Sequence, residues 1–169
     1  MCRIPREVTD PERLATLRDY DLLDTPPDPV LDDLTRVAAQ ICDVPIALLS
    51  LVDAERQWFK SVVGLPVRAT EVSASFCAHA LTGETLVVKD THRDERFKQN
   101  VLVVGDPNIR SYVGTPLVSH NGHVLGTLCV IDRVSRILSP DQLSSLEALG
   151  RVAMGYIETL RASKDRADR

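Results

Sequence analysis

Residues 111–132 determine the predicted fold, and they read Ser111-Tyr-Val-Gly-Thr-Pro-Leu-Val-Ser-His-Asn-Gly-His-Val-Leu-Gly-Thr-Leu-Cys-Val-Ile-Asp132. Two apolar runs flank the dipeptide Asn121-Gly122. This dipeptide favours a two-residue type I′ turn, in which both central residues need a positive φ. The segment therefore predicts a β-hairpin in which Gly114 faces Cys129 across the two strands.

Neither face of this hairpin is polar overall, but one face carries smaller and slightly polar residues. One face carries the pairs Val118/Leu125, Pro116/Thr127, Gly114/Cys129 and Tyr112/Ile131, and the other carries Leu117/Gly126, Thr115/Leu128 and Val113/Val130. Because neither face is polar, we expect the sheet to be covered on both sides. The face with the small residues can form the floor of a cavity over Gly114 and Cys129. The alternative is that these are simply small core residues.

The rest of the chain predicts a mixed α/β (α+β) domain. Caps, proline positions and apolar spacing indicate the following elements: a helix over 11–23, a helix from Asp28-Pro29, strands over 45–52 and 57–63, a short helix over 73–83, a strand over 86–88, an irregular loop over 90–105, and a helix from Ser139-Pro140. We expect residues 1–9 to be a flexible N-terminus, residues 10–160 to be the domain, and residues 161–169 to be a charged helical tail. The apolar stripe of the last helix exceeds what sheet packing needs, so part of it is expected to bury against a second copy.

Composition excludes several classes of function. The chain has 169 residues and a net charge of −4, which argues against nucleic acid or an anionic membrane surface as a partner. No stretch approaches the roughly 18 to 20 apolar residues that span a bilayer. The first residues lack an apolar signal-peptide core, and the four cysteines are widely spaced, which together favour reduced thiols in the cytoplasm.

No catalytic constellation or cofactor motif is visible. Cys77 and His79 are two residues apart and would point about 200° apart on a helix, so they cannot hold one metal ion together. Cys77 is a nucleophile or a small buried hydrophobe, and His79 contacts a ligand or bonds the loop. His120 and His123 would face each other at the hairpin tip, where two imidazoles alone make a weak metal site. We expect no metal site, and the cofactor remains unknown.

Several blocks in a fixed order nevertheless resemble a known family. They are Gln57-Trp-Phe-Lys-Ser61, Ser75-Phe-Cys-Ala-His-Ala80, Arg96-Phe97 with Asn100, Ile109-Arg110 with Tyr112, Gly114-Thr-Pro-Leu117 and Gly126-Thr-Leu-Cys-Val-Ile-Asp132. Together they are similar to bacterial GAF domains, in the subgroup attached to sensor histidine kinases and diguanylate cyclases. The resemblance implies a GAF/PAS-like central antiparallel sheet of five or six strands. It also implies terminal helices on one face and short helices and loops over a ligand pocket on the other.

The resemblance implies a role in signal transduction, as in two-component systems. We predict a non-catalytic sensory module, not an enzyme, that binds a small molecule, forms a homodimer through its N- and C-terminal helices, and acts on a partner such as a histidine kinase or a diguanylate cyclase. The predicted ligand-binding residues are Phe59, Ser75, Phe76, Cys77, His79, Asp90, Phe97, Tyr112, Gly114, Thr127 and Cys129.

Two other functions remain open: a structural dimerisation domain without a ligand, and a redox module or reductase that uses Cys77, with Cys129 as a second thiol. The phosphodiesterase signature NKxxFxxxD is absent. Ala78 separates Cys77 from His79, where bilin-binding relatives have an adjacent Cys-His pair.

Overall fold

The computed structural model describes residues 3–169 and contains one six-stranded antiparallel sheet. The strand order across the sheet is β3-β2-β1-β6-β5-β4. The strands are β1 (Ile46–Val52), β2 (Arg56–Val63), β3 (Ala69–Glu71), β4 (Leu86–Val88), β5 (Ser111–Val118) and β6 (Val124–Asp132). The predicted sheet of five or six strands is confirmed.

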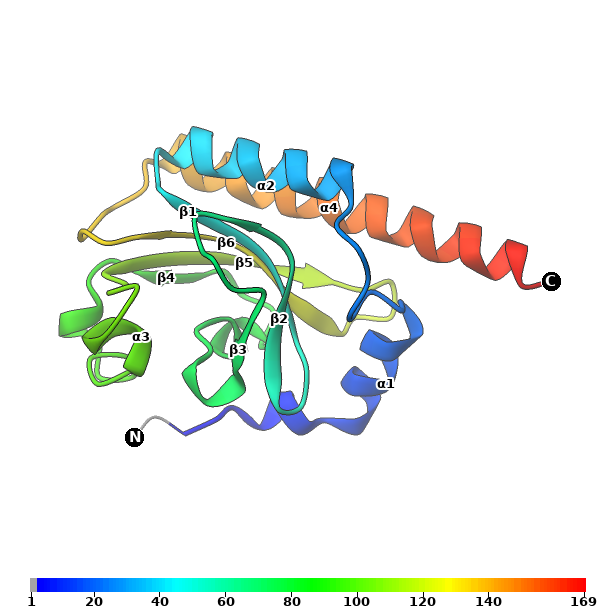
Figure 1. Cartoon of the computed structure of the whole chain (residues 1–169), viewed down its shortest axis with the longest axis horizontal. Coiled ribbons are helices and arrows are strands. Elements are labelled where there is room, and N and C mark those ends of the chain that lie inside the picture. The colour runs from blue at the N-terminus through cyan, green and yellow to red at the C-terminus, as the bar shows by residue number, and fades with distance from the viewer. Residues whose placement is uncertain (1–2) are drawn as a thin grey trace.

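Helices cover one face of the sheet, and short helices and loops cover the other (Figure 1). Helices α2 (Pro29–Cys42) and α4 (Pro140–Ala167) lie side by side on one face. The other face carries α3 (Val101–Val104) and the 3₁₀ turns Val72–Ala74, Cys77–Ala80 and Thr91–Arg93, while α1 (Pro11–Asp19) lies at one end of the sheet. None of the described helices has the length and apolar character needed to cross a membrane.

Both long helices begin where their capping residues predict. The Asp28 carboxylate accepts the backbone N–H groups of Val30 and Leu31 at 2.9 and 3.2 Å, which satisfies donors at the start of α2. Ser139 and Gln142 exchange hydrogen bonds between side chain and backbone at the start of α4, forming a capping box.

The strand register of the β5–β6 hairpin is confirmed over most of its length, but the predicted turn is wrong. Gly114 pairs with Cys129, as expected. Gly122 has a φ of 85°, and its N–H bonds the Ser119 carbonyl at 2.9 Å, whereas Asn121 is not among the residues of positive φ. The turn is therefore a type I turn that ends in a glycine of left-handed conformation.

A β-bulge compensates for the longer turn. The register shifts between Leu117 and Val118, so Val118 pairs with Val124 instead of Leu125. Leu125 consequently joins the apolar cluster under the helices, although the two-residue turn placed it on the cavity face.

The two-sided burial of the sheet is confirmed, because the core consists of two apolar clusters. The cluster on the helix side includes Val113, Leu128 and Val130. The cluster on the opposite side includes Tyr112 and Ile131, which are the alternate residues of the same strands. Alternation along β5 and β6 therefore separates the two clusters.

The predicted helix over 73–83 is interrupted. Ser75 has an extended backbone with ψ of 121°, and its hydroxyl accepts the Ala78 N–H at 3.0 Å. This serine ends one 3₁₀ turn and caps the next, so a continuous helix does not form. The loop predicted over 90–105 is mostly irregular, with the short helix α3 near its end.

The N-terminal segment differs from the flexible arm that the sequence predicts for residues 1–9. Met1 and Cys2 lie outside the described residues. Residues Arg6–Thr9 form a 3₁₀ turn, and Val8 is fully buried.

Arg13 explains why this segment is ordered. Its guanidinium is buried and donates to four carbonyl groups: Glu7 at 2.8 Å, Val8 at 3.0 Å, Val52 at 2.7 Å and Val124 at 3.2 Å. One side chain thus fastens the N-terminal turn to the end of β1 and the start of β6. Sequence periodicity does not reveal this role, because a buried arginine is unusual at a helix position.

Gly126 lies where β6 approaches β1, and it provides a stability test. An added Cβ would overlap the Ser50 carbonyl group, which is backbone and cannot move aside. We expect Gly126→Ala to lower the free energy of unfolding by about 1–3 kcal/mol, measured by urea denaturation. Gly155→Ala is the matched control, because nothing lies within 4 Å of its Cβ position on α4. It should raise stability by up to about 1 kcal/mol. Equal stability of the two variants would contradict the close approach.

Candidate functional site

A cavity of about 230 Å³ lies on the face of the sheet opposite α2 and α4. Most residues of its inner wall are buried. Pro66, Val67 and Asp106 also line the cavity but are exposed, so its mouth lies between these two segments. The lining residues are Leu48, Gln57, Phe59, Leu65, Pro66, Val67, Ala69, Thr70, Phe76, Cys77, Leu102, Asp106, Pro107, Ile109, Tyr112 and Ile131. These residues make the cavity mostly apolar.

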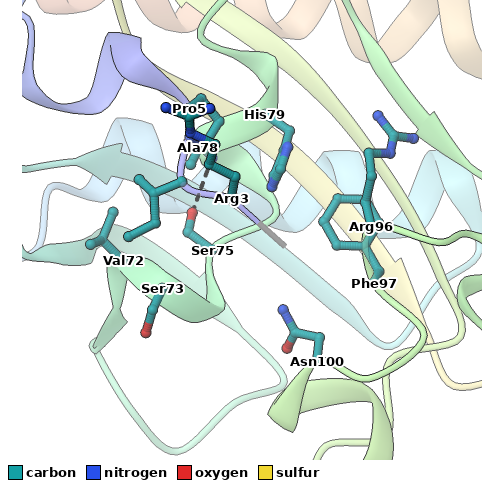
Figure 2. A pocket seen from close by; sticks show the side chains of 11 residues that line it. Arg3, Pro5, Val72, Ser73, Ser75, Ala78, His79, Arg96, Phe97 and Asn100 are labelled. Carbon is teal, nitrogen blue, oxygen red and sulfur yellow. Dashed lines mark hydrogen bonds between the residues drawn. The ribbon is translucent and has the colours of Figure 1, made fainter. Parts of the chain in front are cut away.

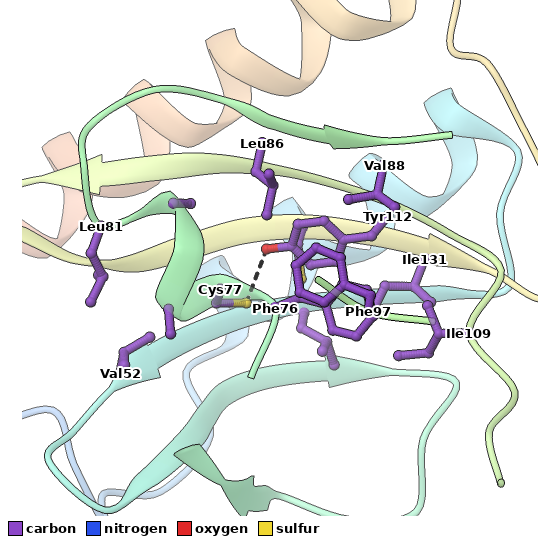
Figure 3. Packing of buried hydrophobic residues seen from close by; sticks show 14 of the residues in the cluster. Val52, Phe76, Cys77, Leu81, Leu86, Val88, Phe97, Ile109, Tyr112 and Ile131 are labelled. Atoms are coloured by element: carbon purple, nitrogen blue, oxygen red, sulfur yellow. Dashed lines mark hydrogen bonds between the residues drawn. The ribbon is translucent and has the colours of Figure 1, made fainter. Parts of the chain in front are cut away.

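The rings of Phe76 and Tyr112 line one side of the cavity, and the Phe97 ring stacks on Phe76 without lining it (Figure 3). The rings of Phe76 and Phe97 stack with centroids 4.1 Å apart and an interplanar angle of 8°. The Tyr112 ring is tilted against Phe76 at 5.2 Å. Each of these three side chains is at least 97% buried. Such a wall suits a flat, apolar group of a ligand.

Polar groups of the lining are few. Gln57 is 4% exposed; its side-chain oxygen accepts the Ser75 hydroxyl, and its nitrogen donates to Thr70 Oγ1 at 3.5 Å. The Asp106 carboxylate belongs to the mouth. The described lining contains no Lys or Arg, so its electrostatic character favours neutral or cationic molecules over anions.

Cys77 lies at the inner end of this cavity and accepts hydrogen bonds through its sulfur. The hydroxyl groups of Tyr112 and Thr127 lie 3.1 and 3.0 Å from Cys77 Sγ, and the Tyr112 bond is drawn in Figure 3. Burial raises the pKa of Cys77, but hydrogen bonds from the surrounding thiol and hydroxyl groups outweigh it and lower the pKa to about 7. Burial also raises the pKa of Tyr112, so its hydroxyl remains a donor.

The structure brings four of the predicted ligand-binding residues to the cavity lining: Phe59, Phe76, Cys77 and Tyr112. Three others line a separate small hollow of about 10 Å³, which Figure 2 shows: Ser75, His79 and Phe97. Burial lowers the pKa of His79, and the nearby Arg96 charge lowers it further. This hollow holds no more than about one water molecule.

The remaining four predicted residues line neither space: Asp90, Gly114, Thr127 and Cys129. Asp90 instead forms an ion pair with Arg110 at 2.8 Å, and hydrogen bonds from Arg110 lower the pKa of this carboxyl to about 2. Thr127 and Cys129 are fully buried behind Cys77.

The cavity predicted over Gly114 and Cys129 is filled at that position. The Tyr112 hydroxyl and ring occupy the place where a Cβ of Gly114 would lie. Tyr112 lies two residues before Gly114 on the same face of β5. Because Gly114 has no side chain, the Tyr112 ring occupies this space. The open space lies farther along the sheet, next to β1 and β2.

Of the wall contributed by residues 57–70 and 102–109, the sequence analysis predicts only Phe59. Gln57 and Ile109 stand in blocks of the family resemblance, but neither they nor Leu65 and Leu102 are among the predicted ligand-binding residues. The alternation of side chains along Gln57-Trp-Phe-Lys-Ser61 does indicate which residues of this strand share a face of the sheet. Phe59 is in the cluster on the cavity face and its neighbour Trp58 is in the cluster under the helices.

His120 and His123 do not come together at the hairpin tip. His120 lies beside Tyr20 and Glu158, with Nδ1 at 3.1 Å from the Tyr20 hydroxyl. His123 approaches the carboxylates of Asp10 and Glu12 at 4.0 and 3.9 Å. Among residues 3–169, no group of three or more His, Cys, Asp or Glu side chains is placed to hold a metal ion.

Comparison with known proteins identifies relatives of the chain. It is 38% identical over 165 residues to a protein of Pseudomonas aeruginosa that is named a cyclic di-GMP phosphodiesterase. This match covers 96% of the chain but only 28% of the relative. The prediction that the protein is not an enzyme is contradicted by this relative, whose name is that of an enzyme.

Solved structures agree with the fold described above. The GAF domain of the Acinetobacter phosphoenolpyruvate-protein phosphotransferase superposes with a TM-score of 0.66 at 20% identity, covering 91% of this chain and 97% of that domain. A domain of a two-component sensor histidine kinase protein from Sinorhizobium meliloti gives a TM-score of 0.62 at 16% identity, covering 82% and 95%.

The family model of the GAF domain matches residues 26–157, which include the whole sheet and most of the helical layer. The predicted resemblance is confirmed: this chain belongs to the GAF domain family.

Proposed function

We propose that the chain is the sensory domain of a bacterial signalling protein and that it binds a small, flat, mostly apolar molecule in the cavity next to β1 and β2. The observation that carries the proposal is the 230 Å³ cavity itself, with its buried aromatic wall. An open cavity costs packing energy, so a domain that served only as a scaffold would gain stability by filling it.

The shape and charge of the cavity limit the class of ligand. Its volume is below the roughly 300–1,000 Å³ typical of pockets for drug-sized ligands. With Asp106 at the mouth and no Lys or Arg in the described lining, an anion would meet unfavourable charge. The ligand class that fits is a neutral or cationic ring system with one polar edge, which Gln57 and Thr70 can reach.

The name of the Pseudomonas relative suggests the output of the signal. We propose that the domain regulates a protein that acts in cyclic di-GMP signalling, because the relative is named a phosphodiesterase of that nucleotide and 96% of this chain aligns with it. A histidine kinase, as in the Sinorhizobium protein, is the alternative output. On this proposal cyclic di-GMP is the substrate of the regulated enzyme, and the cavity is too small and too poor in positive charge to hold it.

We also propose that the signal passes through a homodimer formed by the outer helices. Exposed apolar side chains remain on α2 and α4 after they pack on the sheet: Val30 is 43% exposed, Ile41 is 38% and Val152 is 56%. Apolar positions of this kind on neighbouring helices are typical of surfaces that pair with a second copy.

Ligand binding is tested by thermal shift with indole as a neutral probe and benzamidine as a cationic probe, together with native mass spectrometry of the purified protein. We expect at least one probe to raise the melting temperature by mass action. Leu102→Trp should abolish this shift, because Leu102 lines the cavity.

Val104→Trp is the matched control, since Val104 lies on the same short helix, is 67% exposed and does not line the cavity. Cyclic di-GMP should leave the melting temperature unchanged. Stabilisation of Leu102→Trp by the probes, or of the parent protein by cyclic di-GMP alone, would disprove the assignment of this cavity.

The dimer is tested by sedimentation equilibrium. Val152→Glu should raise the dissociation constant at least about tenfold, because it places a charge at an exposed apolar position of α4. Val101→Glu is the control, because Val101 is 65% exposed but lies on α3, across the sheet. If Val101→Glu weakens the dimer and Val152→Glu does not, the interface lies on the face of the sheet that carries α3, which contradicts the proposal.

A further inference from the structure

Gln57 and Thr70 supply a polar edge inside the cavity. They are opposite partners on β2 and β3, and both side chains line the cavity. Of the other polar groups in the described lining, the Tyr112 hydroxyl is engaged with Cys77 Sγ at 3.1 Å, and Asp106 is exposed at the mouth. A polar group on a bound ring therefore meets Gln57 and Thr70.

Ser75 fixes the orientation of the Gln57 amide. The Ser75 oxygen accepts the Ala78 N–H at 3.0 Å (Figure 2), and the Ser75 hydroxyl donates its single hydrogen to Gln57 Oε1. Ser75 is 3% exposed and lines the small hollow, not the cavity. The amide oxygen of Gln57 therefore points away from the cavity and already holds a donor.

The amide nitrogen is the atom of Gln57 that remains for the cavity. Nε2 carries two hydrogens, and within residues 3–169 it donates only to Thr70 Oγ1, at 3.5 Å. This distance is at the long limit of a hydrogen bond. Gln57 is only 4% exposed, and a buried donor without a good acceptor costs free energy that a bound acceptor would recover.

We propose that Gln57 determines the ligand specificity of the cavity by donating an N–H group to a hydrogen-bond acceptor on the edge of a flat ring, with Ser75 as its positioning residue. The ligand class is accordingly a neutral ring system that carries a carbonyl oxygen or a pyridine-type nitrogen. A ring whose edge carries only N–H groups sets donor against donor at Gln57, which lowers its affinity. The assignment rests on the proposed ligand site and adds the chemistry that this site selects.

The experiment uses two probes of the same bicyclic shape: 1-indanone, whose edge carries a carbonyl oxygen, and indane, which has no polar group. Their dissociation constants are measured by titration calorimetry on the full chain and on Gln57→Met, which has a similar side-chain length and no donor. The ratio of the indane constant to the 1-indanone constant, compared between the two proteins, cancels the difference in hydrophobicity of the probes. We expect Gln57→Met to lower this ratio about three- to tenfold, which corresponds to one hydrogen bond.

Gln40→Met is the matched control. Gln40 is exposed on α2, on the face of the sheet opposite the cavity, so the same substitution there should leave the ratio unchanged.

Ser75 gives a readout that a merely structural role would not move. Ser75→Ala releases the amide, which can then turn its oxygen into the cavity and accept the N–H group of indole. We expect the affinity for indole to rise and that for 1-indanone to fall, whereas Ser75→Thr keeps the hydroxyl and should behave like the parent protein. The circular dichroism melting curve shows whether each variant is folded, and either Gln57→Met or Ser75→Ala alone suffices.

The outcomes separate this role of Gln57 from the ligand site itself. If both probes bind and Leu102→Trp blocks them, an unchanged ratio in Gln57→Met would overturn the role of Gln57 and leave the ligand site intact. An equal fall of the ratio in Gln40→Met would overturn it as well. If neither probe binds the parent protein, the proposed ligand site and the role of Gln57 are both wrong.

Discussion

The pairing of β5 with β6 sets which side chains face the helices and which face the cavity. Once Gly114 faces Cys129, alternation along both strands sends one set of side chains under α2 and α4 and the other set toward the cavity. A shift by one residue would exchange the two sets and expose each to the wrong layer. The bulge at Leu117 preserves this register while the turn adopts the conformation that its glycine favours.

The Tyr112 ring determines which part of the cavity face is filled and which part is open. Tyr112 lies over Gly114, and its hydroxyl reaches the sulfur of Cys77 and approaches Thr127 at 3.3 Å. These contacts close the inner end of the space and give polar partners to groups that would otherwise be buried without any. The cavity that remains extends toward β1 and β2, where Phe59 and Gln57 form the floor.

Cavity and helices are connected through a single layer of strands. On β1, Leu48 lines the cavity, whereas its neighbours Ala47 and Leu49 pack in the cluster under the helices. A change in the cavity therefore has a short mechanical path to α2 and α4. Energetic coupling requires that a ligand favour one of two arrangements of this layer.

The elements that depend on local chemistry could be predicted from the sequence. Asp28 and Ser139 are side-chain caps that predict where α2 and α4 begin. The apolar residues on both faces of the hairpin around Gly114 predict a sheet covered on both sides. Four of the eleven predicted ligand-binding residues, Phe59, Phe76, Cys77 and Tyr112, line the cavity. These features follow from neighbours in the chain or from a period of two or 3.6 residues.

The position of the cavity and the identity of the residues that close it follow from the packing of the folded chain. The filling of the space over Gly114 depends on the direction of the Tyr112 ring, and the burial of Arg13 depends on carbonyl groups from three separate segments. The hydrogen bond from the Thr127 hydroxyl to Cys77 Sγ joins a turn to a strand 50 positions later. Periodicity carries no information about such contacts, because they arise from the packing of distant segments and not from the local geometry of the chain.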